Sequence, residues 1–117
     1  MSGTTSYHAG LSAEASVARL YKRTGHQVVA QRWRGRGGEI DVIAQTGAET
    51  VFIEVKQSES HAAAATRVSD RQIARLFDCA REYMAGLPDG QLSLVRFDIA
   101  LVDGTGRIEI IENALAA

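Results

Sequence analysis

Cysteine is nearly absent from this chain of 117 residues, which contains only Cys79. A single cysteine excludes an internal disulfide and is typical of a cytosolic protein. Together with three scattered histidines it does not form a zinc ligand set. The sequence also lacks an apolar run approaching the ~18–20 residues of a membrane-spanning helix. We therefore expect a cytoplasmic protein that makes no contact with a membrane.

Aromatic residues are also scarce, at 6% of the chain. Glycosidases that use paired carboxylates need aromatic platforms in a sugar cleft, so this class is disfavoured. The sequence contains no nucleophile-elbow motif, no cysteine–histidine pair for nucleophilic catalysis and no dinucleotide-binding fingerprint. The glycine-rich turn at residues 35–38 is not followed by Lys-Ser or Lys-Thr, which excludes a P-loop.

Charge is unevenly distributed, although the net charge is only -1. No acid occurs between Glu14 and Glu39. A basic surface beside an acidic site can hold a polyanion, whereas a solvated face that happens to lack acids is the other interpretation. The basic residues of this segment are Arg19, Lys22, Arg23, Arg32, Arg34 and Arg36.

The most informative stretch, residues 38–56, consists of two apolar segments that carry charges at alternate positions. Residues i and i+2 of a strand point to the same face, so Glu39 and Asp41 share one face of the first segment. Glu54 and Lys56 share one face of the second. The short polar break between the segments predicts an antiparallel hairpin. If the register of the hairpin brings them together, two acids and a lysine meet in one place, and burying them is costly unless they bind something.

This constellation matches the needs of a divalent cation such as magnesium, which prefers oxygen ligands. Asp41 and Glu54 could supply two carboxylates, and the backbone carbonyl of Val55 a third oxygen. Lys56 could then orient or deprotonate an attacking water and steady the charge of a phosphate. A buried salt bridge between Lys56 and one acid is the simpler alternative.

Glu14 lies in a predicted helix that starts near Leu11 or Ser12 and ends at Gly25. Its position is at or beside the inward-facing apolar stripe of that helix. The helix dipole would favour a carboxylate there, and the alternative is that Glu14 reaches across to the strand acids. Residues 1–10 are predicted to be a flexible tail, and residues 11–117 a single domain.

The remaining pattern predicts an α/β fold with the order helix, three strands, helix, two strands around a mixed central sheet. A second helix is expected to start at Ser69 with a capping box, after a mobile loop, and its first turn carries Arg71. A helical crossover should make the third and fourth strands parallel. The expected strands span residues 27–33, 38–44, 50–56, 94–102 and 107–112.

Asp41 followed by Glu54-Val55-Lys56 resembles the PD-(D/E)xK nuclease motif of restriction-endonuclease-like folds. From Gly10 to Asn113 the chain also resembles the YraN-type family of uncharacterised bacterial proteins, which are similar to archaeal Holliday-junction resolvases. The matching residues are Gly10, Glu14, Arg32-Trp33-Arg34, 38–44, 51–56, Ala80, Tyr83, Arg96-Phe97-Asp98 and Asn113-Ala114.

The resemblance implies a three-layer restriction-endonuclease-like fold that uses magnesium or manganese. It also implies an active-site set of Glu14, Asp41, Glu54 and Lys56. The chain departs from the family pattern at Ser58, where an arginine is common, and the second helix often begins with a lysine where this chain has Arg71. Both departures would weaken the grip on a substrate more than the binding of a metal.

We therefore expect a metal-dependent endonuclease acting on DNA or another nucleic acid, including branched or structured DNA. The residues expected to hold backbone phosphates are Arg32, Arg34, Arg36 and Arg71. A resolvase would also be expected to form a homodimer, because symmetric cleavage of two strands needs two sites. The alternatives are a non-catalytic nucleic-acid-binding module on the same fold and a protein-interaction domain.

Overall fold

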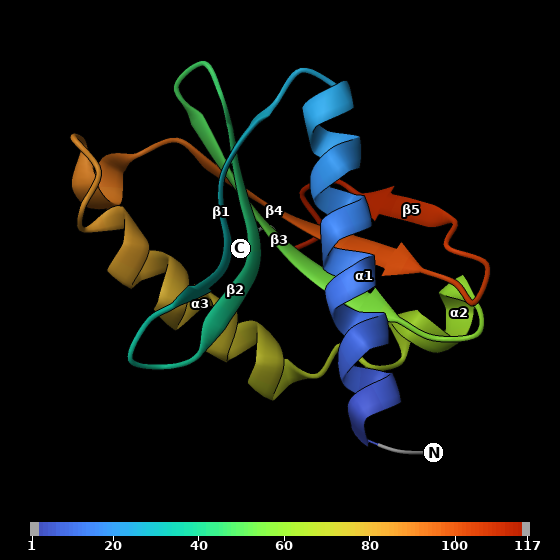
Figure 1. Cartoon of the computed structure of the whole chain (residues 1–117). Coiled ribbons are helices and arrows are strands. Elements are labelled where there is room, and N and C mark those ends of the chain that lie inside the picture. Colours follow the sequence, from blue (N-terminus) through green and yellow to red (C-terminus); the bar gives the residue numbers. More distant parts are fainter. Residues whose placement is uncertain (1–2, 116–117) are drawn as a thin grey trace.

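A five-stranded mixed β-sheet organises the chain, and the computed structural model describes residues 3–115 of it (Figure 1). The elements are α1 (Gly3–Arg23), β1 (Gln27–Arg34), β2 (Glu39–Thr46), β3 (Glu49–Gln57), α2 (His61–Ala65), α3 (Asp70–Met84), the 3₁₀ helix η1 (Gly90–Leu92), β4 (Val95–Val102) and β5 (Ile108–Ile111). The strands lie in the order β1-β2-β3-β4-β5. This arrangement confirms the predicted mixed α/β fold, to which α2 and η1 add two short helices.

The β2–β3 hairpin forms as predicted, with Ile43 opposite Phe52 in an antiparallel ladder. Its turn consists of two residues, the first of which is Gly47 with a φ of 57°. Two-residue hairpin turns require positive φ, and glycine adopts it without a steric penalty. The turn therefore sets the register that positions the charged ends of both strands.

β3 and β4 are parallel, and the chain between them crosses over through α2 and α3. α3 begins after Ser69, whose side chain accepts from the Gln72 N–H while Gln72 returns a bond to the Ser69 backbone. This capping box confirms the predicted helix start, since it satisfies two backbone donors that a helix N-terminus leaves free. The segment predicted as a mobile loop contains α2, which Ser60 caps.

The predicted start of the first helix near Leu11 or Ser12 is wrong, because α1 begins at Gly3. Residues 3–10 are therefore helical rather than the expected tail, and the first two residues of that tail lie outside the described part of the chain. This segment contains no proline and no charged side chain that would stop a helix. Extending an existing helix adds one hydrogen bond per residue, so the packed part of α1 can propagate upstream.

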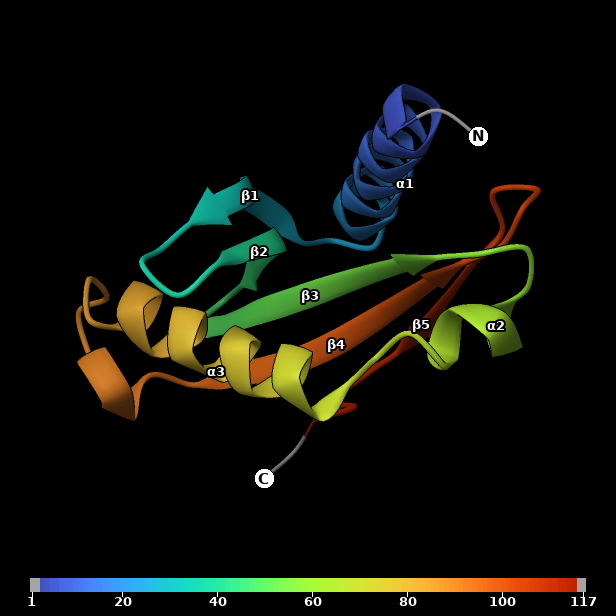
Figure 2. The same cartoon turned by 90° about the horizontal axis from the view of Figure 1, so that it is seen from below.

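The two long helices cover opposite faces of the sheet (Figure 2). On one face, Val17 and Tyr21 of α1 share a core with Val42 and Ile53. On the other face, Leu76, Cys79, Ala80 and Met84 of α3 share a core with Ile40, Ile43 and Phe52. Within residues 3–115, no helix has the length and apolar character needed to cross a membrane.

A buried carboxylate, Asp98 of β4, connects three parts of this fold. It has no solvent exposure and accepts hydrogen bonds from Tyr21 Oη at 2.6 Å and from the Asn113 N–H at 2.9 Å. Arg96 donates to both of its oxygens, each at 2.8 Å. Helix α1, strand β4 and the chain after β5 are thus held by one side chain.

Asp98→Ala should lower the free energy of unfolding by at least ~2 kcal/mol, because it leaves Arg96 and the Tyr21 hydroxyl without their buried partner. Urea denaturation measures the change. Asp78→Ala is the matched control, since Asp78 pairs with Arg81 on the exposed face of α3 and should cost no more than ~0.5 kcal/mol. Equal stability of the two variants would contradict the role of Asp98.

Candidate functional site

The charged residues of the hairpin meet at the point where β2 and β3 separate. The ladder between the strands ends at the pair Val42 and Ile53, and the next residue on each strand is Asp41 and Glu54. Beyond this point the Val55 N–H donates to Asp41 Oδ2 at 2.8 Å instead of to the β2 backbone. The register of the predicted hairpin therefore brings Asp41 and Glu54 to the same place.

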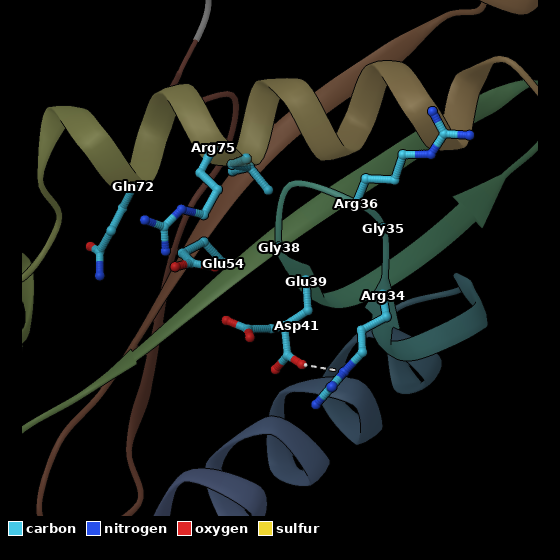
Figure 3. Close-up of a pocket in the computed structure, with 10 residues that line it drawn as sticks. Arg34, Gly35, Arg36, Gly38, Glu39, Asp41, Glu54, Gln72 and Arg75 are labelled. Atoms are coloured by element: carbon cyan, nitrogen blue, oxygen red, sulfur yellow. Dashed lines mark ion pairs between the residues drawn. The ribbon is translucent and has the colours of Figure 1, made fainter.

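An open pocket of about 440 Å³ lies at this position, between the strand ends, the β1–β2 turn and α3 (Figure 3). Its walls differ in charge, because acids come from β2 and β3 whereas arginines come from β1, the turn and α3. The lining residues are Arg34, Gly35, Arg36, Gly38, Glu39, Asp41, Glu54, Gln72, Arg75 and Leu76. We call this space the acid pocket.

Three carboxylates form the tightest cluster at the acid pocket. Glu14 of α1 and Glu39 and Asp41 of β2 each place one oxygen so that the three oxygens lie within 4.8 Å of one another. We call these residues the acid triad. The side chain of Glu14 therefore reaches across to the strand acids, which was the alternative to a carboxylate that only interacts with the helix dipole. Glu39 was placed on the same face as Asp41 by strand alternation but was not assigned to the site.

Glu54 and Lys56 form an ion pair beside the acid triad, with Lys56 Nζ 3.1 Å from Glu54 Oε2. Both side chains are largely buried, with exposed fractions of 16% for Lys56 and 17% for Glu54. The pair is the salt bridge that the simpler interpretation expected, and it borders Asp41 on the neighbouring strand. The structure thus brings together all four residues of the predicted active-site set, in two adjoining groups.

Burial and mutual repulsion make this cluster electrostatically costly. Burial raises the pKa of Asp41 to about 9, and the charge of Glu54 and a hydrogen bond with Glu54 act in the same direction. The Val55 N–H opposes this rise. Burial also raises the pKa of Glu14, against the attraction of Arg32. Asp41 therefore retains its proton at neutral pH unless additional positive charge neutralises the cluster.

The donor set fits a hard divalent cation such as magnesium or manganese, because the three side chains of the acid triad offer only carboxylate oxygens. Glu14 Oε1 is buried and has no hydrogen-bond partner among the side chains that the structure describes. This set shares Asp41 with the predicted ligands but contains Glu14 and Glu39 in place of Glu54. The Val55 N–H donates to Asp41 Oδ2 at the site, and the role of the Val55 carbonyl as a metal ligand stays a prediction.

Arg32 is directed into the acid triad. Its Nε lies 3.6 Å from Glu39 Oε1 and 3.9 Å from Glu14 Oε1. The sequence placed Arg32, Arg34 and Arg36 on one face by alternation, but Arg32 has a φ of 52°. A left-handed residue breaks the alternation of a strand, and non-glycine residues adopt this conformation rarely.

The other predicted phosphate-binding arginines occupy different positions. Arg34 Nε lies 3.5 Å from Glu39 Oε2, and its side chain is 78% exposed. The Arg36 backbone N–H donates to Glu82 Oε1 at 2.9 Å, and Figure 3 shows its side chain directed away from the acids. Arg71 is exposed and is not among the described residues that line the acid pocket.

Sequence reasoning missed Gln72 and Arg75, which line the acid pocket from α3. The signal was helical spacing. Gln72 stands four residues before the buried Leu76, and Arg75 four before the buried Cys79. Residues at i and i+4 share a helix face, so both polar side chains lie along the edge of the stripe that packs on the sheet.

The chain matches known proteins over its whole length. The family described as "Uncharacterised protein family UPF0102" matches residues 13–102. A UPF0102 protein of Cereibacter sphaeroides strain KD131 is 62% identical over 117 residues, which cover 100% of both chains. A UPF0102 protein of Ruegeria pomeroyi is 57% identical over 112 residues, or 96% of this chain and 91% of the relative. One from Roseobacter denitrificans is 50% identical over 114 residues, or 97% and 88%.

The raised pKa of Asp41 predicts a pH-dependent stability. Below ~4 the carboxyl is protonated in the folded and the unfolded chain alike. As pH rises from there towards the folded pKa of about 9, only the unfolded chain ionises, so the free energy of unfolding decreases. Asp41→Asn removes the ionisable carboxyl, and with it this loss of stability, but keeps an oxygen that can accept from the Val55 N–H.

In metal-free buffer, Asp41→Asn should therefore be more stable than the wild type by ~1 kcal/mol at pH 5 and by ~3 kcal/mol or more at pH 8. Urea denaturation at both pH values measures the gain. Asp78→Asn on the exposed face of α3 serves as the control and should show no such gain. Parallel pH profiles for Asp41→Asn and the wild type would mean that Asp41 ionises normally in the folded chain.

Proposed function

This chain belongs to the UPF0102 family, which is the YraN-type family, and from that premise we propose that it is a metal-dependent nuclease. It would hydrolyse phosphodiester bonds in DNA, including branched or structured DNA. The observation that carries the proposal is the buried Asp41, which lies between two further acids and the Glu54–Lys56 pair in an open pocket. A purely structural site would have little use for three converging carboxylates, because their burial is costly.

Glu14, Glu39 and Asp41 would hold magnesium or manganese. Once bound, such an ion lowers the pKa of a coordinated water and neutralises charge on a phosphate. The Val55 N–H keeps the Asp41 carboxylate in one orientation by its bond to Oδ2. Rigid strands at both sides of the pocket reduce the freedom of these side chains, which favours a preorganised site.

Lys56 is the residue best placed to act on the attacking water or the phosphate. Its ammonium is held 3.1 Å from Glu54 at the end of β3, where its side chain is 16% exposed. An ammonium offers three donors and can orient a water or stabilise the charge that develops on a phosphate. Glu54 would serve mainly to position Lys56, and its charge also acts on Asp41.

A second candidate function is nucleic-acid binding without turnover. The observation that favours it is Arg32, which lies against both Glu14 and Glu39 and already supplies positive charge to the acid triad. Binding of this kind would weaken steeply with added salt and would persist without a metal. A homodimer belongs to the nuclease proposal when the substrate is a branched junction, because two strands then need two sites.

Calorimetric titration with manganese should show saturable binding to the wild type. Asp41→Asn should weaken manganese binding at least ~10-fold, because even substitutions that only disturb the residues around a metal site lower metal affinity by about that factor. Cleavage of branched DNA in magnesium should be lost in this variant and on addition of EDTA. Lys56→Ala should bind manganese like the wild type but cleave ~100-fold or more slowly, because it removes only the proton-handling group.

Glu109→Ala is the control for both measurements, since Glu109 is 55% exposed on β5 and lies outside the acid pocket. Wild-type cleavage by Asp41→Asn would exclude the proposed nuclease site. The non-catalytic module would instead be supported if the wild type neither binds manganese nor cleaves DNA. Its DNA binding should then persist in EDTA and weaken with added salt.

A further inference from the structure

Arg75 faces the acid pocket from the wall opposite the acid triad. It lies about one turn of α3 after Gln72, and both residues line the pocket. Figure 3 shows its side chain descending from α3 towards Glu54 and the β2 acids. The pocket therefore has a cation on the α3 side and carboxylates on the strand side, with open space between them.

Of the three arginines that line the acid pocket, Arg75 is the one that is directed at the acids and forms no ion pair with a described residue. Arg34 is paired with Glu39 at 3.5 Å, and the side chain of Arg36 is directed away. Arg75 forms no ion pair with any residue between 3 and 115. Glu54, towards which Figure 3 shows the Arg75 side chain directed, is already paired with Lys56. The guanidinium of Arg75 is thus available for an incoming anion.

Gly38 leaves the space that the Arg75 side chain occupies. A Cβ atom at Gly38 would lie 2.9 Å from Arg75 Cδ and 3.1 Å from Cγ, so the aliphatic part of the arginine packs where any other residue would place a side chain. Gly38 has a φ of 147° and directly precedes Glu39, the first residue of β2. The backbone that starts the acid-bearing strand therefore packs against the aliphatic part of Arg75.

We propose that Arg75 binds a non-bridging phosphate oxygen of the substrate across the acid pocket. The proposal rests on the proposed function, because it names the subsite that would hold the phosphodiester next to the acid triad. A guanidinium can donate two parallel bonds to a phosphate, which fixes its orientation as well as its charge. Phosphate contacts carry no sequence information, so Arg75 should contribute equally to all sequences.

Anisotropy of a short fluorescein-labelled DNA duplex, measured in EDTA over a series of salt concentrations, tests Arg75 directly. Arg75→Ala should bind ~5–10-fold more weakly at low salt and should reduce the slope of log K against log salt by about 1. Arg75→Lys should keep the slope but recover only part of the affinity, because an ammonium cannot donate in a bidentate manner. Two duplexes of unrelated sequence should give the same loss.

Arg81→Ala is the matched control, since Arg81 lies on the same helix but pairs with Asp78 away from the pocket. Its affinity should stay within ~2-fold of the wild type. Urea denaturation checks the fold of each variant, and Arg75 is exposed enough for its replacement to leave the core intact.

Manganese calorimetry separates this inference from the proposed function. Arg75→Ala should bind manganese like the wild type, because it lies outside the acid triad. Wild-type affinity and salt slope in Arg75→Ala would overturn the phosphate subsite, even if the wild type binds manganese and cleaves DNA. Conversely, a specific loss in Arg75→Ala with no manganese binding by the wild type would support the subsite and contradict the nuclease.

Discussion

The burial of Asp41 is the constraint on which the architecture of the site depends. This carboxyl is 9% exposed, at the position where the β2–β3 ladder stops. An ionised carboxylate is rarely buried without compensation. Here the compensation is the Val55 N–H at 2.8 Å and a pKa raised to about 9 by burial and by Glu54. The backbone donor that would have continued the ladder is thus used to hold the acid, and the strand separation leaves room for the pocket.

The site also requires both layers of helices. Glu14 reaches the strand acids from α1 on one side of the sheet, whereas Arg75 lines the same pocket from α3 on the other. A flat, continuous sheet would keep the two helices apart. Because β2 and β3 part at Asp41 and Glu54, side chains from α1 and from α3, which lie on opposite sides of the sheet (Figure 2), can approach the same acids. The divergence that ends the hairpin is therefore also what assembles the charged residues.

Local patterns were sufficient for the hairpin and for the pairing of Asp41 with Glu54, because strand alternation and a two-residue turn determine register. The capping box at Ser69 was equally visible, since it is encoded within four residues. Arg32 and Arg34 both reach Glu39, as alternation suggested, although the φ of 52° at Arg32 departs from the extended backbone that alternation assumes. Arg75 could not be assigned from the sequence alone, because its role depends on the contact with Gly38, which lies on a different element.

The charge balance of the site explains how the acids coexist. Glu14, Glu39, Asp41 and Glu54 are neutralised by Arg32, Arg34 and Lys56, which leaves one acid without a cationic partner. The raised pKa of Asp41 supplies the missing positive charge as a proton. A divalent cation bound to the acid triad would replace that proton, so metal binding and deprotonation of Asp41 are coupled in the proposed function.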